Sequence, residues 1–331
     1  MVETITDVRV HISVLYPSPR VGLGRPAIFV KGTGLAYKEY TTLEELKTDF
    51  ADTTETFAKA KTLLAQKNKP DLIAVVTFEE GKILAAAEEY FLKSWHFALL
   101  AENKAADALA LSNLIEENKF KFAVFQFATA AEIAPLVKNT RTIALVHSKI
   151  EENLDAALVG DVASLPVGSA TWKGRHKLEG ITAEMLKVSE IDAIQKAGGL
   201  CYIEKAGIPQ TSEGKTVSGE FIDSIHGDDW IKATIETRLQ KLLTETDKIT
   251  FDARGIALLQ GELTTVLNEG FANGIIDSND ETGEANYSIT ALQRPDLSDD
   301  DIAKRNYKGL SFRYKRSGAI HSVDVYGEIE V

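Results

Sequence analysis

The sequence contains only one cysteine, Cys201, among its 331 residues, so no disulfide can form within the chain. A lone cysteine is typical of proteins made in a reducing cytosol. Because Leu200 and Tyr202 flank it, we interpret Cys201 as a small buried apolar residue. Long apolar runs are also missing: no stretch approaches the roughly 18 apolar residues of a membrane-spanning helix, so no membrane insertion is predicted.

Basic residues are also fewer than acidic residues. The chain has 37 Lys and Arg against 49 Asp and Glu, which gives a formal net charge of −12. Nucleic-acid binding depends on clustered basic side chains, so this balance argues against a nucleic-acid partner. The N-terminal stretch carries Asp7, Arg9 and His11 among its apolar residues, which does not match a signal peptide, and we expect assembly inside the cell that makes the protein.

The motifs that mark common enzyme sites are missing. The pairs Gly22/Gly24 and Gly32/Gly34 are not followed by the helix that a nucleotide site needs, and no serine stands in a G-x-S-x-G turn. No two of the six histidines have the i, i+4 spacing of a helical zinc site. We therefore predict no catalytic, cofactor-binding or metal-binding residues and no cofactor.

Two acidic clusters need an explanation. The first is His226-Gly-Asp228-Asp229, which we interpret as a turn followed by an aspartate that caps a helix rather than as a metal site. The second comprises Asp277, Asn279, Asp280 and Glu284, whose order does not fit an EF-hand loop. Three classes remain open at this point: an assembly protein, a divergent α/β enzyme, or a small-molecule binding domain.

What the sequence does contain is a long stretch of alternating apolar strands and helices. Between about residues 40 and 165, amphipathic helical segments separate near-continuous apolar runs of strand length. This pattern predicts a largely parallel sheet covered by helices. The expected strands of this sheet are Leu72–Phe78, Trp95–Ala101, Phe120–Phe127 and Thr142–His147. Separate strands are expected at Ala27–Lys31, before this stretch, and at Leu200–Glu204, after it.

The C-terminal third has a different pattern. Two long helices are predicted, the first from Asp228 or Asp229 to about Leu243 and the second from Asp252 to Phe271. We expect strands at Tyr287–Leu292 and Leu310–Lys315, on either side of a short acidic helix capped by Ser298. Residues 207–220 are predicted to be an exposed loop.

Each end of the chain offers an alternating apolar strand without a hairpin partner beside it in sequence. At the N-terminus one face carries Val8, Val10, Ile12 and Val14. At the C-terminus, within Ile320–Val331, one face carries His321, Val323, Val325, Ile329 and Val331. These strands pair either within their own chain or with neighbouring subunits, and the alternation alone does not decide which.

Several segments of the last 120 residues or so occur in an ordered series. The series includes Gly219-Glu-Phe-Ile-Asp-Ser-Ile-His-Gly-Asp-Asp-Trp230, Asp252-Ala-Arg-Gly-Ile256, Asp300-Asp-Ile-Ala-Lys-Arg305 and Gly318-Ala-Ile-His321. In this order it resembles the C-terminal domain of contractile, phage-type tail sheath proteins. The resemblance covers about residues 200–331.

The resemblance implies an architecture of two domains. Residues 1–35 and 200–331 would form an inner α+β domain, with a mixed sheet and two long helices built from both chain ends. Residues 36–199 would form an inserted outer α/β domain. In such proteins terminal arms add strands to sheets of adjacent subunits.

The resemblance also implies the function and the partners. The chain would be a structural subunit of a virion tail, assembled in the bacterial host cytoplasm, that polymerises helically around a tail tube and contracts to drive the tube through a target cell envelope. Its partners would be further copies, the tube protein, and baseplate and tail terminator proteins. The chain is short for a sheath, so a non-contractile tail or virion protein with the same inner domain is the main alternative, ahead of a divergent α/β enzyme.

A sheath must slide on its tube, so polar contacts are expected there. Charged residues of the two long helices are the candidates for facing the tube, unless they only form a solvated helix face. They are Lys232, Arg238, Lys241 and Arg254.

Overall fold

The computed structural model describes residues 23–326, and the main feature of this part is a seven-stranded sheet. The strand order is β2-β3-β1-β4-β5-β6-β7, and every neighbouring pair is parallel except β2 with β3. The predicted, largely parallel sheet is thereby confirmed. The strands are β1 (Pro26–Lys31), β2 (Ala36–Tyr40), β3 (Ile73–Phe78), β4 (Phe97–Leu100), β5 (Phe122–Phe127), β6 (Thr142–Val146) and β7 (Gly199–Leu200).

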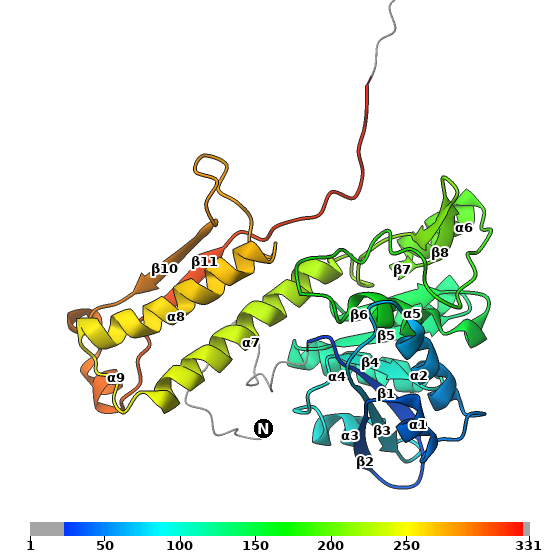
Figure 1. The fold of residues 1–331 in the computed structure, drawn as a ribbon, viewed down its shortest axis with the longest axis horizontal. Coiled ribbons are helices and arrows are strands. Elements are labelled where there is room, and N and C mark those ends of the chain that lie inside the picture. The colour runs from blue at the N-terminus through cyan, green and yellow to red at the C-terminus, as the bar shows by residue number, and fades with distance from the viewer. Residues whose placement is uncertain (1–22, 327–331) are drawn as a thin grey trace, which may run out of the picture.

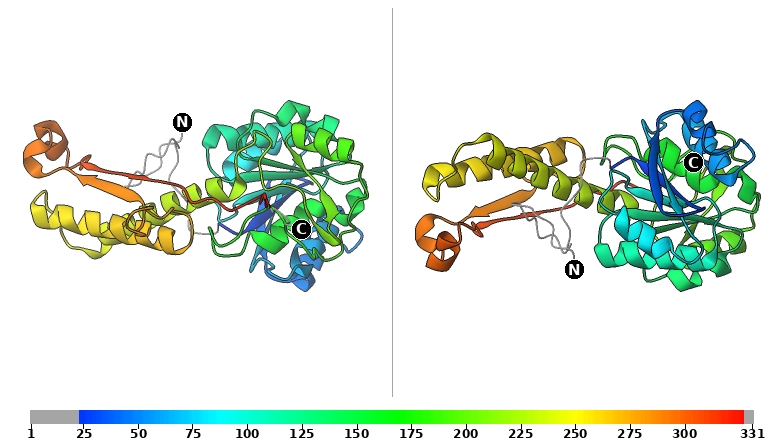
Figure 2. Two further views of the ribbon diagram at one scale, coloured as in Figure 1. Left: turned by 90° about the horizontal axis from the view of Figure 1, so that it is seen from above. Right: turned by 90° about the horizontal axis from the view of Figure 1, so that it is seen from below.

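Helices cover both faces of this sheet (Figures 1 and 2). One face packs on α1 (Leu43–Lys47), α2 (Glu55–Ala65) and α5 (Leu154–Val162), and the other on α3 (Ile83–Glu89), α4 (Ala105–Asn118), the 3₁₀ turn Ala130–Leu136 and α6 (Val188–Lys196). Successive strand residues point to opposite faces, so Ile28 belongs to one core cluster and Phe29 to the other. A buried ion pair of 2.7 Å between Lys59 and Asp155 joins α2 to α5.

The C-terminal part forms an elongated unit beside the sheet domain (Figure 1). Helix α7 (Ile222–Glu245) begins against the sheet domain and runs out of it, and α8 (Ala253–Ala272) returns alongside. A two-stranded antiparallel ribbon of β10 (Tyr287–Ala291) and β11 (Leu310–Tyr314) packs on these helices. The 3₁₀ turn Arg294–Asp296 and α9 (Asp299–Ala303) connect the two strands.

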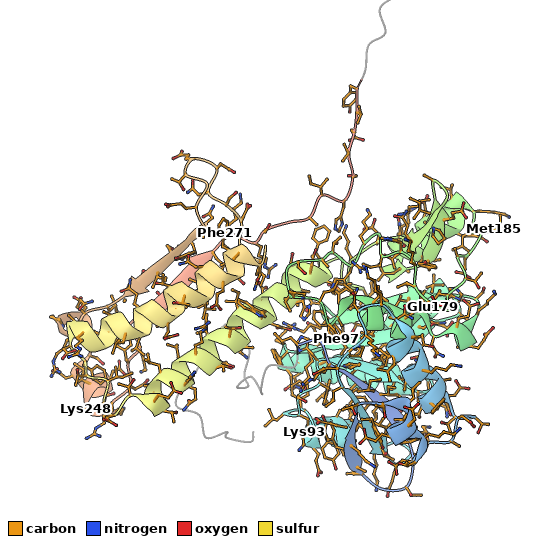
Figure 3. The ribbon with its side chains drawn as sticks, in the orientation of Figure 1. Lys93, Phe97, Glu179, Met185, Lys248 and Phe271 are labelled. Carbon is orange, nitrogen blue, oxygen red and sulfur yellow. The ribbon has the colours of Figure 1, made fainter. Side chains whose placement is uncertain are left out.

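The two units lie end to end. Lys248 marks the far tip of the elongated unit, and Met185 lies at the opposite end of the molecule (Figure 3). Near Met185 the chain forms a second antiparallel ribbon, β8 (Tyr202–Lys205) with β9 (Ile208–Thr211). Within residues 23–326, no helix has both the length and the apolar character needed to cross a membrane.

Three sequence-based expectations are wrong in detail. Strand β1 was expected in an inner domain formed from both chain ends, but it lies inside the seven-stranded sheet between β3 and β4. The expected loop at 207–220 contains β9, and β2 was missed. Both missed strands are short, and β2 is a largely exposed edge strand without a clear apolar alternation.

Candidate inter-subunit surfaces and the junction that positions them

The ribbon of β10 and β11 has strand edges to which further strands could be added. Its register pairs Tyr287 with Tyr314 and Ala291 with Leu310. In the described residues no third strand pairs with either, so each has one edge whose backbone groups lack a strand partner. The side chains of Ile289 and Phe312 pack toward α7 and α8, which holds the ribbon in place on one face. Such an edge is a surface for strand addition.

Directly after β11 the chain is fastened to α7 through Asp228. The Nε atom of Arg316 donates to Asp228 Oδ1 at 3.1 Å, and a second guanidinium nitrogen and the Tyr314 hydroxyl also bond this carboxylate. Burial raises the pKa of Asp228 despite these partners. Ser317 N donates to Ile275 O at 2.9 Å, so the chain leaves the ribbon beside α7 and the end of α8.

Beyond Ser317 the chain crosses to the sheet domain and then extends away from the molecule (Figure 1). His321 contacts Thr171 there, whereas Val323 and Val325 are 73% and 85% exposed. The strand expected over Ile320–Val331 is not formed in its described part, because residues 320–326 have no strand partner among residues 23–326. Two apolar side chains on one side of an uncovered, extended segment are what a strand donor presents.

A buried ionic cluster fastens α7 to the sheet domain. Arg141, just before β6, donates two hydrogen bonds of 2.7 and 2.8 Å to the carboxylate of Asp229 on α7. His96, just before β4, places Nε2 3.0 Å from the same carboxylate. Burial alone would raise the pKa of Asp229, but Arg141 and His96 outweigh it and lower this pKa to about 2. A bidentate pair of this kind fixes both the distance and the rotation of α7.

Two further buried groups complete the junction. The His226 ring stacks on the His96 ring, with the two centroids 5.4 Å apart. Nε2 of His226 forms a hydrogen bond of 2.7 Å with the carbonyl oxygen of Leu23. Burial lowers the pKa of His226 to about 3, so this imidazole is neutral. Lys121 donates to the carbonyl oxygens of Lys93 and Trp95, and burial holds its pKa well below the ordinary value.

This geometry corrects the interpretation of His226-Gly-Asp228-Asp229. The helix begins at Ile222, so neither aspartate caps it, and both lie within its second and third turns. The three side chains diverge: His226 bonds Leu23, Asp228 bonds Arg316, and Asp229 bonds Arg141. Residues 23–326 hold no group of three or more side chains suited to a metal ion.

The candidates for facing the tube occupy different environments. Lys232 is only 2% exposed, so in this subunit it is not available to a tube, contrary to the expectation. Nη1 of Arg238, on α7, lies 3.6 Å from Oε2 of Glu262 on α8. Arg238 also forms an ion pair with Glu269 of α8. Lys241 and Arg254 are exposed and stay candidates.

Only some of the residues predicted for the terminal arm strands lie within the described part of the chain. Val8, Val10, Ile12, Val14, Ile329 and Val331 lie outside the described residues. The prediction that Cys201 is buried is confirmed, with no exposed surface, and burial raises the pKa of its thiol.

The junction was not predicted from the sequence, because His96, Lys121 and Arg141 are parts or neighbours of apolar strands. A signal was present: each is a basic residue at the start of an apolar strand segment. Basic residues in such places are buried only when they are paired. What the sequence did not contain was the partner, because Asp229 lies 88 positions from Arg141.

Comparison with known proteins gives a consistent result. Residues 222–329 match the family model "E217 tail sheath protein gp31-like, C-terminal domain". No curated protein sequence matches the chain.

Solved structures share the fold at low sequence identity. A chain in the baseplate of the anti-feeding prophage matches with a TM-score of 0.70 and 10% identity, covering 99% of both chains. A chain of the same baseplate in its contracted state matches with a TM-score of 0.68 and 12% identity, again covering 99% of both. The sheath tail protein Lin1278 from Listeria innocua matches with a TM-score of 0.58 and 10% identity, covering 92% of this chain and 96% of that one.

The family match covers α7, α8, the ribbon and the extended segment, which are the parts that carry the candidate surfaces. Tail sheath proteins are structural proteins and not enzymes, which agrees with the expectation from the sequence. Residues 222–329 thus match the C-terminal domain of a tail sheath protein family, and the fold along the chain is that of solved sheath tail proteins.

Proposed function

We propose that this protein polymerises helically around a tail tube and contracts to drive the tube through a target envelope, using its terminal segments as links between subunits. The proposal rests on two features of the described subunit that lack a strand partner. Within residues 23–326, the ribbon has unpaired strand edges, and residues 322–326 form an unpaired extended chain. A neighbouring copy supplies what each lacks.

The link would form by strand addition between subunits. Residues 322–326 of one copy would pair with an edge of β10 or β11 in the next, with Val323 and Val325 turned toward its helices. Each added backbone hydrogen bond contributes roughly 0.5–1.5 kcal/mol net, so four or five give several kcal/mol per link. Helical symmetry repeats that link along the particle.

The shapes of the two units suggest which layer of the sheath each one occupies. We assign the elongated unit, residues 228–316, to the inner layer and the sheet domain, residues 23–227, to the outer layer. This replaces the boundary at residue 35 because β1 is a central strand of the sheet. Lys241 and Arg254, near the distal end of the elongated unit, would then make polar contacts with the tube.

Contraction would be a rearrangement of subunits that keep their internal structure and stay linked. The junction of Arg141, His96 and Asp229 holds α7 to the sheet domain. The energy would be stored in the contacts formed at assembly, so the movement needs no nucleotide.

Electron microscopy of the purified protein, with and without its tube partner, tests the proposal. We expect tubes or helical sheaths from the full chain and only soluble single subunits after deletion of Ile320–Val331. A sharper variant is Val323→Asp with Val325→Asp, because both side chains are exposed and their exchange leaves the fold intact. The matched control, Ser322→Ala with Asp324→Ala, changes the alternate positions and should assemble normally.

Two results would contradict the proposal. Normal sheaths from the deletion variant would exclude the C-terminal segment as a link. Rings or fixed tubes that never shorten under contraction-inducing conditions would favour the alternative, a non-contractile tail or virion protein built on the same domain.

A further inference from the structure

The C-terminal segment is held at a second point before it leaves the molecule. The first point is the pairing of Arg316 with Asp228. The second is His321, whose Nε2 lies 3.0 Å from the hydroxyl oxygen of Thr171 in the sheet domain. Its ring also meets the Phe221 ring edge-on, with centroids 5.1 Å apart. His321 is thus partly buried, whereas its neighbours Ile320 and Ser322 are exposed.

The Thr171 hydroxyl is itself held by the sheet domain. Its oxygen accepts a hydrogen bond from the backbone N–H of Lys173 at 3.4 Å. His321 Nε2 contacts the same oxygen, so this contact ties His321 to the backbone of the sheet domain.

The other ring nitrogen shows that this contact is not a simple core packing arrangement. Nδ1 of His321 is buried and has no hydrogen-bond partner among the described residues. A buried polar atom without a partner carries a desolvation cost, so this histidine is not placed there to optimise the stability of one subunit. Its placement determines where the chain leaves the surface.

We propose that His321 is a positioning residue: together with Thr171 and Phe221 it fixes the origin and direction of the C-terminal segment that links subunits. This inference rests on the proposed linking function. With His321 held, Val323 follows the anchored residue by two positions and can lie at most about 7 Å from it. Without this contact the last anchored residue is Ser317, six positions before Val323, and the distance can reach about 22 Å.

Fixing the point at which the C-terminal segment leaves the surface raises the effective concentration of this segment at the strand edge of the neighbouring subunit. That concentration falls roughly as the −3/2 power of the tether length, so lengthening the tether before Val323 from two to six residues lowers it about fivefold. The loss of the fixed exit direction adds to this. Loss of the His321 contact should therefore raise the protein concentration needed for assembly about fivefold.

The contact is tested first on the single subunit. A nitroxide label is attached at Asp324→Cys in a Cys201→Ala background, where the natural thiol is buried and no other cysteine exists. We expect His321→Ala and Thr171→Val each to increase the mobility of the label, and the double variant to go no further than either alone. Thr171→Ser keeps the hydroxyl and should behave like the parent, as should His176→Ala, which removes an exposed histidine.

The positioning role is tested on assembly of the unlabelled proteins, with electron microscopy and sedimentation over a range of concentrations. We expect His321→Ala to assemble only at higher concentration, and Thr171→Ser and His176→Ala at the concentration of the parent. Unchanged label mobility in His321→Ala would overturn the contact. Increased mobility with an unchanged assembly threshold would overturn the positioning role. If the parent itself never assembles, the proposed linking function and the positioning role fail together, while the label still decides whether the contact exists.

Discussion

At the scale of single residues, the most consequential feature is the pairing of Asp229 with Arg141. Both side chains are buried, and two hydrogen bonds join them between α7 and the start of β6. Taking two charges out of water is costly, and only a well-formed pair offsets that cost. The pair therefore adds more to the fixed placement of α7 than to net stability.

Removal of one partner should be far more damaging than the net value of the pair. We expect Asp229→Ala to lower the free energy of unfolding by about 3–5 kcal/mol, because Arg141 is left buried and unpaired. The matched control is Asp300→Ala, which removes an exposed i, i+4 pair with Lys304 and should cost less than about 0.5 kcal/mol. Urea unfolding followed by circular dichroism measures both. Equal effects would show that the cluster is solvated.

The neutral His226 imidazole makes stability depend on pH in a defined direction. Burial lowers its pKa to about 3 in the folded state, whereas in the unfolded chain a histidine titrates near pH 6.5. As pH falls, the unfolded state therefore binds the proton first. The contribution of neutral His226 to the free energy of unfolding is complete above about pH 6.5 and is lost as pH falls toward 3. His226→Phe should reduce the slope of unfolding free energy against pH in this range. The same slope in the parent and the variant would contradict the assignment.

At the scale of elements, close helix contacts in the sheet domain depend on a glycine. A Cβ atom at Gly160 of α5 would lie 2.5 Å from the carbonyl oxygen of Leu63 on α2. The obstacle is backbone, which cannot rotate away as a side chain can. The approach of α2 to α5 therefore depends on the absence of a side chain at this position.

This dependence predicts opposite effects for one substitution at two helical glycines. Gly160→Ala should destabilise the protein by about 1–3 kcal/mol, because α2 and α5 must move apart. Gly261→Ala in α8 meets nothing within 4 Å and should stabilise it by up to about 1 kcal/mol through helix propensity. Thermal unfolding of the two variants beside the parent measures both signs. A gain at both positions would show that the α2–α5 contact yields easily.

At the scale of the whole molecule, the net charge of −12 opposes assembly of identical subunits. Copies that meet along a helix repel one another over a distance set by the Debye length. That length falls from about 30 Å at 0.01 M salt to about 8 Å at 0.15 M. Backbone strand pairing is much less sensitive to salt, so it operates against a repulsion that salt removes.

We therefore expect assembly to begin at a lower protein concentration in 0.15 M than in 0.01 M sodium chloride, measured by light scattering. The control is the free energy of unfolding at the same two salt concentrations, which separates a change in the subunit from a change between subunits. Weaker assembly at the higher salt would show instead that pairs of opposite charge dominate the interface.

Local sequence patterns were enough to predict the elements that depend on residues close together in the chain. Alternating apolar runs and amphipathic helices predicted the strands β3 to β6 and the helices between them, because the period of the pattern reports which face is buried. The Ser298 cap was identified correctly because a cap involves residues three positions apart. The ordered series that begins at Gly219 was enough to predict the family that the C-terminal domain matches.

Contacts between residues far apart in the chain became known only from the fold. Only the fold placed β1 between β3 and β4, brought Arg141 to Asp229, buried Lys232, and set His321 against Thr171. These contacts join residues tens to hundreds of positions apart, and pattern reasoning over a short window contains no information on which distant charge will be the partner. Local periodicity determines what each segment becomes; the packing of whole elements determines which side chains are buried, paired or left free for a neighbour.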